Sequence, residues 1–522
     1  MFKDFNKKVE IGVFYPAFAL IAFIILWGAI HYSSLSAGSK WLMNFIRMDL
    51  GAWINFCTTS CVAVLAYLMF SKRGDIRIGG KDAKSPISFF SWFTMSLCSS
   101  IGVGIIFWGI AEPLMHFTNP PAFLGVTGSS PAAGAAAMGS VYIDWGFHPN
   151  SFIAVVGIAV AVAAHNYNLP VRISSIFHPM IGDRIYKKLG MGIDSFAIAF
   201  YIIATGTMIS YASMQMAAGI EYMTGIQATR TVSLIIIAVL GVYYTLSSVS
   251  GIKKAVSFNA NLNFGIYVVL LAFVLLVGRT VFIVNLTMDG IANYASRFLA
   301  GGIFMDAFNV SDGWVQGWPV FMFAWFAATT FITSNFYAQI SVGRTIREMV
   351  FVNAVLPGIF AIVWFGIFGS AAIDMEYSGA GLMQIINNKG IDVAAYEFFK
   401  RMPLASIMIP LFFIGGVMSF VTGVNSCVTA VSVMSQNRAE QGEGDMREPA
   451  KIIKIIWGAS FAIIGAIVLC LGDVKDIQTA AITSGLPSSI LIFLALICLI
   501  IATNPSYMAK YSTVYGEKCQ KD

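Results

Sequence analysis

Two glycines interrupt an apolar run in the first quarter of the chain. The run covers residues 88 to 114, and in its middle Ser100 and Ile101 precede Gly102 and Gly104. Glycine loosens a helix, and the freed carbonyl groups can coordinate a cation while freed N–H groups can bind a carboxylate. Alternatively, the glycines only allow helices to pack tightly. In both cases this backbone must lie inside protein, because lipid cannot satisfy its polar groups.

Aromatic residues stand close to helix-loosening residues in three apolar runs. Trp108 follows the two glycines, Trp145 directly precedes a glycine, and Trp325 with Phe326 follows a Trp-Pro pair. Aromatic faces attract quaternary ammonium groups at roughly 0.5–2 kcal/mol per contact, so several rings can bind a cation that has no N–H donor. Any one of these rings would also suit a core or an interfacial belt. Their coincidence in three runs predicts an aromatic cage for a substrate.

Asp144 is a carboxylate inside an apolar run. A charge at membrane depth is costly, so such a residue indicates a function: it carries a coupling proton, binds a cation or faces a cationic substrate. The alternative is a structural partner for a backbone N–H or for an arginine near a helix end. Glu112 and Glu221 lie nearer to the ends of their runs, so we expect both to be solvated.

The sequence has no motif that supports catalysis. It contains no His/Asp/Glu cluster with metal-ligand spacing, no phosphate-binding loop and no nucleophile elbow. Its seven cysteines form no Cys-x-x-Cys pair, and the rings of charge that line a channel are missing. We therefore expect neither an enzyme nor a channel, and no cofactor other than sodium or a proton as coupling ion.

The composition indicates what positions these residues. Of 522 residues, 57% are hydrophobic and 11% are charged, and the mean hydropathy is +0.76. Soluble domains carry about 25% charged residues, so membrane lipid is the expected solvent of this chain. The net charge of +6 is spread over short loops, which argues against nucleic acid as a partner.

Helices of about 20 apolar residues cross a bilayer. Twelve are predicted, at 11–31, 51–71, 88–114, 134–164, 192–223, 231–249, 258–284, 318–340, 350–373, 405–435, 452–471 and 477–502.

The basic residues predict the orientation of these helices. When the N-terminus is placed in the cytoplasm, 23 of the 32 Lys and Arg residues fall in cytoplasmic loops and tails. Positive charge concentrates on the cytoplasmic side of membrane proteins. Both termini are therefore expected in the cytoplasm, which requires an even number of crossings.

One polar stretch divides the chain. Residues 285–317 carry Asp289, Arg297, Asp306 and Asp312, so we expect an external amphipathic segment rather than a span. Two spans and then five precede it, and five follow, which is the layout of a five-plus-five inverted repeat preceded by two extra helices. The predicted organisation is an N-terminal part, a first repeat, the external segment, a second repeat and a short cytoplasmic tail, at 1–87, 88–284, 285–317, 318–502 and 503–522.

Four stretches resemble the betaine/choline/carnitine transporter family. They are Gln339–Glu348, which is similar to the family signature of the eighth helix, together with Trp145–Pro149, Asn166–Ser174 and Gly485–Leu491. The resemblance implies an all-α protein of twelve helices with a leucine-transporter-like inverted repeat. It also implies a homotrimer in the bacterial inner membrane that couples uptake of small trimethylammonium zwitterions to sodium or protons, or exchanges them.

The chain departs from the family pattern at the aromatic positions. Asn150 and Ile153 stand where the family has a second Trp and a Tyr on the fourth span, and Phe326 and Thr329 replace two tryptophans of the eighth. Phenylalanine is a weaker cation–π partner than tryptophan, and Asn150 and Thr329 add hydrogen-bonding capacity. We expect a more polar or smaller substrate than glycine betaine, with ectoine or taurine as non-quaternary alternatives.

The resemblance also suggests ligands for a coupling ion. Ser419 and Thr422 of the tenth span resemble a hydroxyl-bearing run beside Ser100 and Ile101, and Thr205 of the fifth span matches a threonine linked to a second sodium site. Sodium would be held chiefly by Thr422 and Thr205. The alternative is that these hydroxyls bond only to their own helix backbone.

The seventh span bears on the choice between symport and exchange. Sodium-independent exchangers of the family place an arginine there, at the position where this chain has Asn261. The missing fixed positive charge favours an ion-coupled symporter. Exchange of precursor and product remains the alternative.

Overall fold

The protein is described by a computed structural model at residues 2–100, 102–249, 252–437, 449–470 and 474–515. Within these ranges the chain is built of helices, and its only β-type pairings are two isolated bridges, Val9 with Gln436 and Arg77 with Thr345.

Eleven stretches are long and apolar enough to cross a membrane. A further pair, α5 (Phe89–Ser100) and α6 (Gly102–Trp108), bends by 56° and forms the twelfth span when it is counted as one. The predicted all-α membrane fold is thus confirmed. The other spans are α2 (Ile11–Ile30), α4 (Gly51–Phe70), α8 (Pro131–Trp145) with α9 (Phe147–Asn166), α11 (Lys188–Thr224), α12 (Arg230–Val249), α13 (Ile252–Val277), α16 (Trp314–Gly317) with α17 (Pro319–Ile340), α18 (Ile346–Val350) with α19 (Leu356–Tyr377), α22 (Ala405–Ser435), α23 (Lys451–Cys470) and α24 (Val474–Ala502).

Local sequence signals set the helix ends. The Ser130 side chain accepts a hydrogen bond from the N–H of Ala133 and caps α8, with Pro131 at the first helical position. The predicted span 134–164 is divided between α8 and α9 at Gly146, where a Cβ would lie 2.3 Å from the carbonyl oxygen of Tyr142. Only glycine fits this break, which places Trp145 at the end of a helix.

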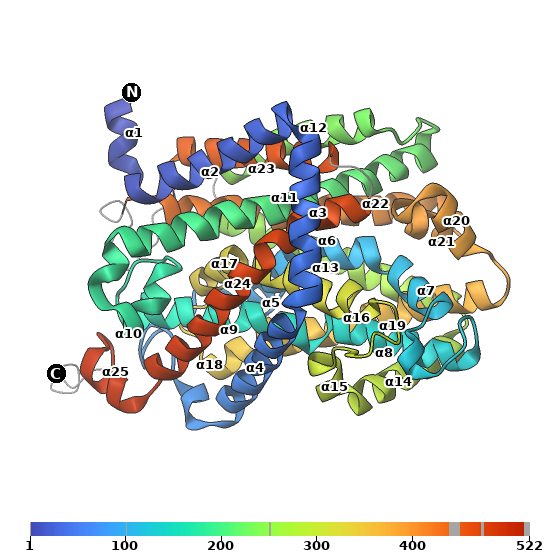
Figure 1. Cartoon of the computed structure of the whole chain (residues 1–522), viewed down its shortest axis with the longest axis horizontal. Coiled ribbons are helices and arrows are strands. Elements are labelled where there is room, and N and C mark those ends of the chain that lie inside the picture. The colour runs from blue at the N-terminus through green and yellow to red at the C-terminus, as the bar shows by residue number, and fades with distance from the viewer. Residues whose placement is uncertain (1, 101, 250–251, 438–448, 471–473, 516–522) are drawn as a thin grey trace.

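The two ends of the molecule carry different short helices (Figure 1). The terminal helices α1 (Phe2–Lys8) and α25 (Pro505–Tyr511) lie at the same end of the long axis, on the left of the view. At the opposite end lie α7 (Ala111–Thr118), α14 (Thr280–Ser296), α20 (Leu382–Lys389) and α21 (Ala394–Lys400). The longer α3 (Tyr32–Asp49) runs across the spans. The spans therefore run between the end with both terminal helices and the end with α7, α14, α20 and α21.

Helix α17 lies at the centre of the bundle, where it packs against α9, α24 and α11. Its contact with α24 is close, because a Cβ on Gly485 would lie 2.6 Å from the carbonyl oxygen of Ala324. Small residues allow such backbone approach in membrane proteins. This packing fixes Trp325, the next residue of α17, in the interior.

The polar segment expected after the seventh span follows a helix break inside the predicted span 258–284. Helix α13 ends at Val277 and α14 begins at Thr280, so that predicted span was too long. The buried residues of α14 are Ile283, Leu286, Gly290 and Tyr294, which share one face directed at α8 and α19. The segment is thus amphipathic, as expected, but its apolar face covers protein.

The order of the spans matches the prediction. Helices α2 and α4 come first, five spans lie between α4 and α14, and five follow α14. The five-plus-five layout with two extra helices is confirmed in this order. The exact domain boundaries at residues 87, 284, 317 and 502 stay predictions.

Candidate functional site

The break between α5 and α6 brings backbone polar groups into the interior. It lies between Ser100 and Gly102, while the predicted ion-coupling residue Ile101 lies outside the described residues. The hydroxyl of Tyr267 donates a 3.3 Å hydrogen bond to the carbonyl oxygen of Gly102. A Cβ on Gly102 would lie 3.2 Å from that hydroxyl oxygen, so the glycine allows the contact. The predicted helix interruption is therefore present and packs against α13.

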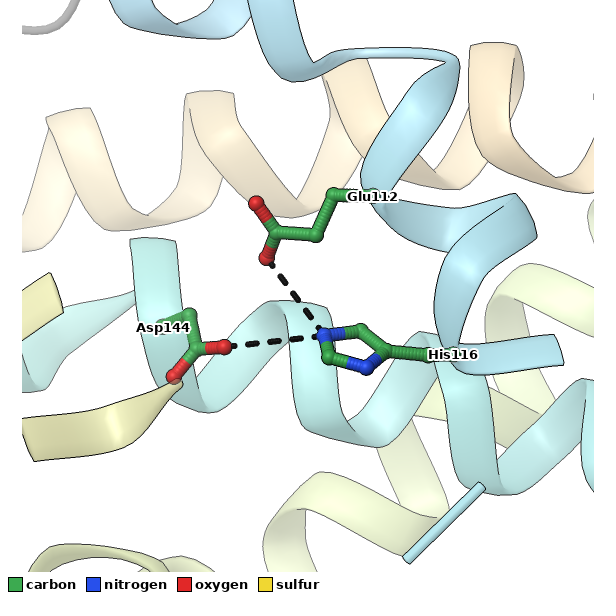
Figure 2. Close-up of side chains that lie close together, drawn as sticks. All are labelled: Glu112, His116 and Asp144. Atoms are coloured by element: carbon green, nitrogen blue, oxygen red, sulfur yellow. Dashed lines mark ion pairs between the residues drawn. The ribbon is translucent and has the colours of Figure 1, made fainter. Parts of the chain in front are cut away.

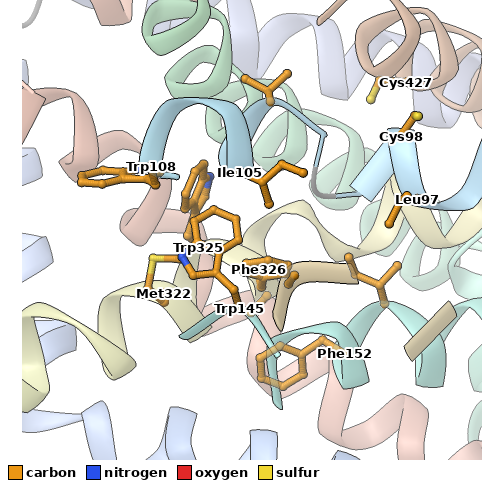
Figure 3. Close-up of a cluster of buried hydrophobic side chains, with 14 of the residues drawn as sticks. Leu97, Cys98, Ile105, Trp108, Trp145, Phe152, Met322, Trp325, Phe326 and Cys427 are labelled. Carbon is orange, nitrogen blue, oxygen red and sulfur yellow. The ribbon is translucent and has the colours of Figure 1, made fainter. Parts of the chain in front are cut away.

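Three of the predicted rings meet beside this break (Figure 3). Trp145 of α8 contacts Trp325 and Phe326 of α17, with ring centroids 6.2 and 5.8 Å apart and near-perpendicular planes. Gly104 completes the arrangement, because a Cβ there would lie 2.5 Å from Cη2 of Trp145. We call Trp145, Trp325 and Phe326 the aromatic cluster. All three side chains are buried.

Rings from two further helices join the cluster. Tyr211 of α11 lies 6.1 Å from Trp325, and Phe365 of α19 lies 5.3 Å from Trp145, between ring centroids. Trp108 reaches the cluster through Tyr211, at 6.0 Å. Sequence reasoning missed Tyr211 and Phe365. Tyr211 stands beside no glycine or proline, and although Gly366 directly follows Phe365, nothing in the chain order marks either ring as a neighbour of Trp145 or Trp325.

The indole N–H groups of the site differ in their partners. Nε1 of Trp145 donates a 2.8 Å hydrogen bond to Oε2 of Glu112. Within the described parts of the chain, Nε1 of Trp108 and Nε1 of Trp325 are buried and have no hydrogen-bond partner. Buried polar groups are nearly always paired, so these two N–H groups are available to a ligand.

Asn150 does not contribute its amide N–H₂ to the cluster. The amide nitrogen donates to the carbonyl oxygens of Trp145 and Gly146, at 3.1 and 2.7 Å. It thus provides hydrogen bonds to carbonyl groups at the break between α8 and α9. Thr329 bonds to the carbonyl oxygens of Trp325 and Phe326 on its own helix, at 3.2 Å each. The donors predicted from these two departures are therefore used by the backbone, whereas Oδ1 of Asn150 is buried without a hydrogen-bond partner among the described residues.

A polar group lies on the other side of the α5–α6 break, on α13 and α22. Ser419 accepts a 2.9 Å hydrogen bond from Nδ2 of Asn263, pairs with the hydroxyl of Tyr267 and donates to the carbonyl oxygen of Gly415. Three residues further along α22, Oγ1 of Thr422 is buried with no partner among the described residues. Of the two hydroxyls predicted on this helix, one is therefore engaged and the other is free.

The remaining predicted hydroxyls bond within their own helices. Ser100 donates to the carbonyl oxygen of Leu97 at 3.3 Å, and Thr205 donates to that of Tyr201 at 2.8 Å. Each oxygen keeps lone pairs that can still coordinate an ion.

A second constellation joins α7 to α8, next to the aromatic cluster (Figure 2). Nε2 of His116 lies 3.8 Å from Oε1 of Glu112 and 3.7 Å from Oδ2 of Asp144. The side chains of Glu112 and Asp144 are 0% exposed and that of His116 is 1% exposed. We call Glu112, His116 and Asp144 the acidic-histidine cluster.

This cluster corrects two expectations. Glu112 is buried rather than solvated, because α7 folds back onto α8, whereas Glu221 is exposed as expected. The expectation of no His/Asp/Glu cluster was also wrong. The spacing of Glu112 and His116, four residues apart on one helix face, was the available signal. Only the tertiary fold adds Asp144.

Arg297 follows α14 and acts electrostatically on Asp144. Burial lowers the pKa of the Arg297 guanidinium from its ordinary value, and the Asp144 carboxylate opposes that shift. Arginine keeps its charge under such shifts. Arg297 thus supplies a positive charge near the two carboxylates of the cluster.

Comparisons with known proteins cover nearly the whole chain. The sequence model of the betaine/carnitine/choline family of transporters matches residues 12–507. A probable glycine betaine transporter of Desulfitobacterium hafniense (strain Y51) is 31% identical over 92% of this chain and 95% of its own length. An ectoine/hydroxyectoine transporter of Virgibacillus pantothenticus is 28% identical, with 92% of this chain and 94% of that protein covered.

Two more comparisons concern a further relative and a solved structure. The glycine betaine transporter OpuD of Bacillus subtilis (strain 168) is 28% identical, with 92% of both chains covered. Among solved structures, a Na⁺-coupled sialic acid symporter aligns with 85% of this chain and 86% of its own, at 13% identity and a TM-score of 0.45.

Proposed function

Since this chain belongs to the betaine/carnitine/choline family of transporters, we propose that it imports a small betaine-like zwitterion by ion-coupled alternating access. The protein is a multi-pass membrane transporter and not an enzyme. Its substrate enters the interior at the α5–α6 break.

The observation that carries this proposal is the aromatic cluster. Trp145 and Trp325 meet nearly edge to face at the break, with Phe326 beside them. A quaternary ammonium group offers no hydrogen-bond donor, so ring faces are its natural partners, at about 0.5–2 kcal/mol each. Closure of the rings on one another in this structure leaves Trp145 against the backbone of Gly104. A bound ligand would lie between the rings of Trp145, Trp325 and Phe326.

The carboxylate of the substrate needs hydrogen-bond donors close to the aromatic cluster. The free indole N–H groups of Trp108 and Trp325 provide two, and the loosened backbone at Gly102 and Gly104 can provide more. A zwitterion with a cationic head and a carboxylate a few ångströms away fits this combination. Glycine betaine and ectoine, named for the relatives, both have this character.

We place sodium, as the coupling ion, between α22 and the α5–α6 break. The free hydroxyl of Thr422 lies on α22, and a Cβ on the next residue, Gly423, would lie 3.9 Å from the carbonyl oxygen of Cys98 near the end of α5. Ser419 of α22 is already engaged by Asn263 and Tyr267, so an ion bound by its oxygen would replace one of these hydrogen bonds. Sodium sites in discontinuous-helix transporters use such carbonyl and hydroxyl oxygens. Thr205 belongs to a second candidate site on α11.

A proton on Asp144 is the rival coupling ion. Uptake that is driven by a pH gradient, ignores sodium and is lost in Asp144→Asn would replace the sodium proposal.

The cellular setting is proposed on the same grounds. Both terminal helices lie at one end of the molecule (Figure 1). In the sequence, 23 of the 32 Lys and Arg residues fall in the tails and loops predicted on the side of the termini. We assign that end to the cytoplasm and the protein to the bacterial inner membrane, as a homotrimer. Cysteine accessibility at the two ends and cross-linking in the membrane test this assignment.

The decisive experiment is uptake into proteoliposomes. Labelled glycine betaine, ectoine, carnitine, choline and taurine are offered with and without an inward sodium gradient. We expect uptake of a betaine or ectoine that requires the gradient. Transport that needs a preloaded internal substrate and no gradient would identify an exchanger, and failure of all five to bind or move would refute the substrate class.

A further inference from the structure

The acidic-histidine cluster has the composition of a metal site. We infer that Glu112, His116 and Asp144 bind a divalent transition-metal ion of the Zn²⁺ type. The three candidate ligand atoms, one from each residue, lie within 4.8 Å of one another (Figure 2). They come from two helices, α7 and α8, so an ion here would join them.

The ligand atoms are buried and unused. Oε1 of Glu112, both nitrogens of His116 and both oxygens of Asp144 have no hydrogen-bond partner within the described ranges. Such groups are rarely left unpaired in a protein interior, and each costs roughly 1–3 kcal/mol when it is. A single cation that takes one ligand atom from each side chain satisfies three of these five atoms at once.

The dimensions suit a small ion. Zinc binds His nitrogen and carboxylate oxygen at about 2.0–2.2 Å, which puts tetrahedral ligand atoms roughly 3.4 Å apart. The distances from Nε2 of His116 are 3.8 Å to Glu112 and 3.7 Å to Asp144. Closing these two distances requires side-chain shifts of a few tenths of an ångström. The third pair, the oxygens of Glu112 and Asp144, lies within 4.8 Å and has to close by at most about 1.4 Å. The imidazole of His116 is held in place, because the rings of Trp314 and Trp318 pack against it.

The charges favour a dication. Two carboxylates lie in the interior with Arg297 as the nearby positive charge, which leaves one negative charge unbalanced when the imidazole is neutral. An imidazole ligand selects zinc-like ions over magnesium and calcium, which prefer oxygen. The ion that fits is therefore a divalent transition metal.

The site also has an orienting contact. Oε2 of Glu112 accepts the hydrogen bond from Nε1 of Trp145, which leaves Oε1 free for the ion. Such outer contacts orient ligands in metal sites. A bound ion would fix the position of the Glu112 carboxylate. Through the hydrogen bond from Trp145, it would also fix the orientation of that ring in the aromatic cluster.

The test is metal binding by the purified, metal-stripped full-length protein, which does not depend on transport. We expect one Zn²⁺ per chain by equilibrium dialysis, no competition from Mg²⁺ or Ca²⁺, and a higher unfolding temperature with Zn²⁺. His116→Ala and Asp144→Asn should weaken binding by at least about 10- to 100-fold, the loss expected even for outer contacts of a metal. His31→Ala, which removes an exposed histidine, should bind as the wild type does.

A measurement on the wild-type protein protects the test against misfolded variants. X-ray absorption at the zinc edge should show imidazole nitrogen and oxygen ligands without sulfur. Sulfur ligation would assign the ion to cysteine and overturn the proposal. Binding that survives in both His116→Ala and Asp144→Asn would overturn it as well, and so would the absence of binding by the wild type.

Discussion

The indole nitrogen of Trp145 lies 2.8 Å from Oε2 of Glu112, and this hydrogen bond connects the aromatic cluster to the acidic-histidine cluster. Both side chains are fully buried. A ring that is expected to face a substrate cation is therefore held by a carboxylate from the neighbouring helix α7.

Removing this acceptor should disturb substrate binding. In Glu112→Ala the buried indole N–H loses its partner, at a cost of about 1–3 kcal/mol, so we expect roughly tenfold weaker substrate binding and a lower unfolding temperature. Glu112→Gln keeps an acceptor oxygen and should lie between this variant and the wild type. Equilibrium binding of labelled substrate measures the effect, with the exposed Glu221→Ala as control. Wild-type affinity in Glu112→Ala would contradict the coupling.

The approach of Trp145 to α6 should tolerate glycine alone at position 104. A Cβ in Gly104→Ala would lie 2.5 Å from Cη2 of the ring, so the indole must move, and we expect uptake to fall at least about tenfold, because a methyl that overpacks a core costs about 1–3 kcal/mol. The matched control is Gly265→Ala on α13, where a Cβ meets no atom within 4 Å. Equal uptake rates in the two variants would show that the ring contact is unimportant.

The aromatic cluster should discriminate between charged head groups. Trp145→Ala and Trp325→Ala should each weaken binding of a quaternary substrate by about 0.5–2 kcal/mol, which corresponds to roughly 2- to 30-fold, while Trp→Phe should lose less. Trp41→Ala, at a residue that is 69% exposed, serves as control. Isothermal titration with glycine betaine and with an uncharged isostere separates the cation–π contribution. Identical losses for both ligands would indicate that the rings act only by packing.

The free hydroxyl of Thr422 should matter for sodium. In Thr422→Ala we expect the sodium concentration for half-maximal uptake to rise at least about tenfold, since an interaction with a charged group is worth about 1.5–3 kcal/mol. Thr429→Ala is the matched control, because that hydroxyl is buried on the same helix and already donates to the carbonyl oxygen of Asn425. An unchanged sodium dependence in Thr422→Ala would remove this residue from the ion site.

Glu397 should contribute stability that depends on pH. It accepts hydrogen bonds from Tyr222 and Arg401 and lies 3.6 Å from Lys389, so it ties α11 to α21. Burial alone would raise the pKa of this carboxyl, but the two hydrogen bonds and the charges of Arg401 and Lys400 outweigh it and lower the pKa below its ordinary value.

A lowered folded-state pKa means that ionised Glu397 stabilises the folded protein. We expect Glu397→Gln to cost about 1.5–3 kcal/mol at neutral pH, in line with hydrogen bonds to a charged group. The difference from the wild type should shrink as the pH falls below the unfolded value of about 4.3 and through the lowered folded value. Thermal unfolding across pH measures it, with the exposed Asp289→Asn as control. A constant difference down to acid pH would disprove the ionic contribution.

The sequence by itself determined which segments cross the membrane and where they break. Span length follows from the thickness of the bilayer, and the breaks at Gly102, Gly146 and Pro319 follow from local backbone chemistry, so both can be read along the chain. Trp145, Trp325 and Phe326 were predicted together for the same reason, since each stands near such a break.

Only the tertiary structure decided which side chains meet. Tyr211 and Phe365 reach the aromatic cluster from α11 and α19, which chain order alone does not place beside Trp145 and Trp325, and Asp144 meets Glu112 and His116 because α7 folds back onto α8. A contact between helices depends on the packing of every side chain around it, whereas a helix and its breaks depend on residues a few positions apart. The sequence therefore predicted the positions of the spans. Only the packing of α7 against α8 buried Glu112, which was expected to be solvated, in a cluster with His116 and Asp144.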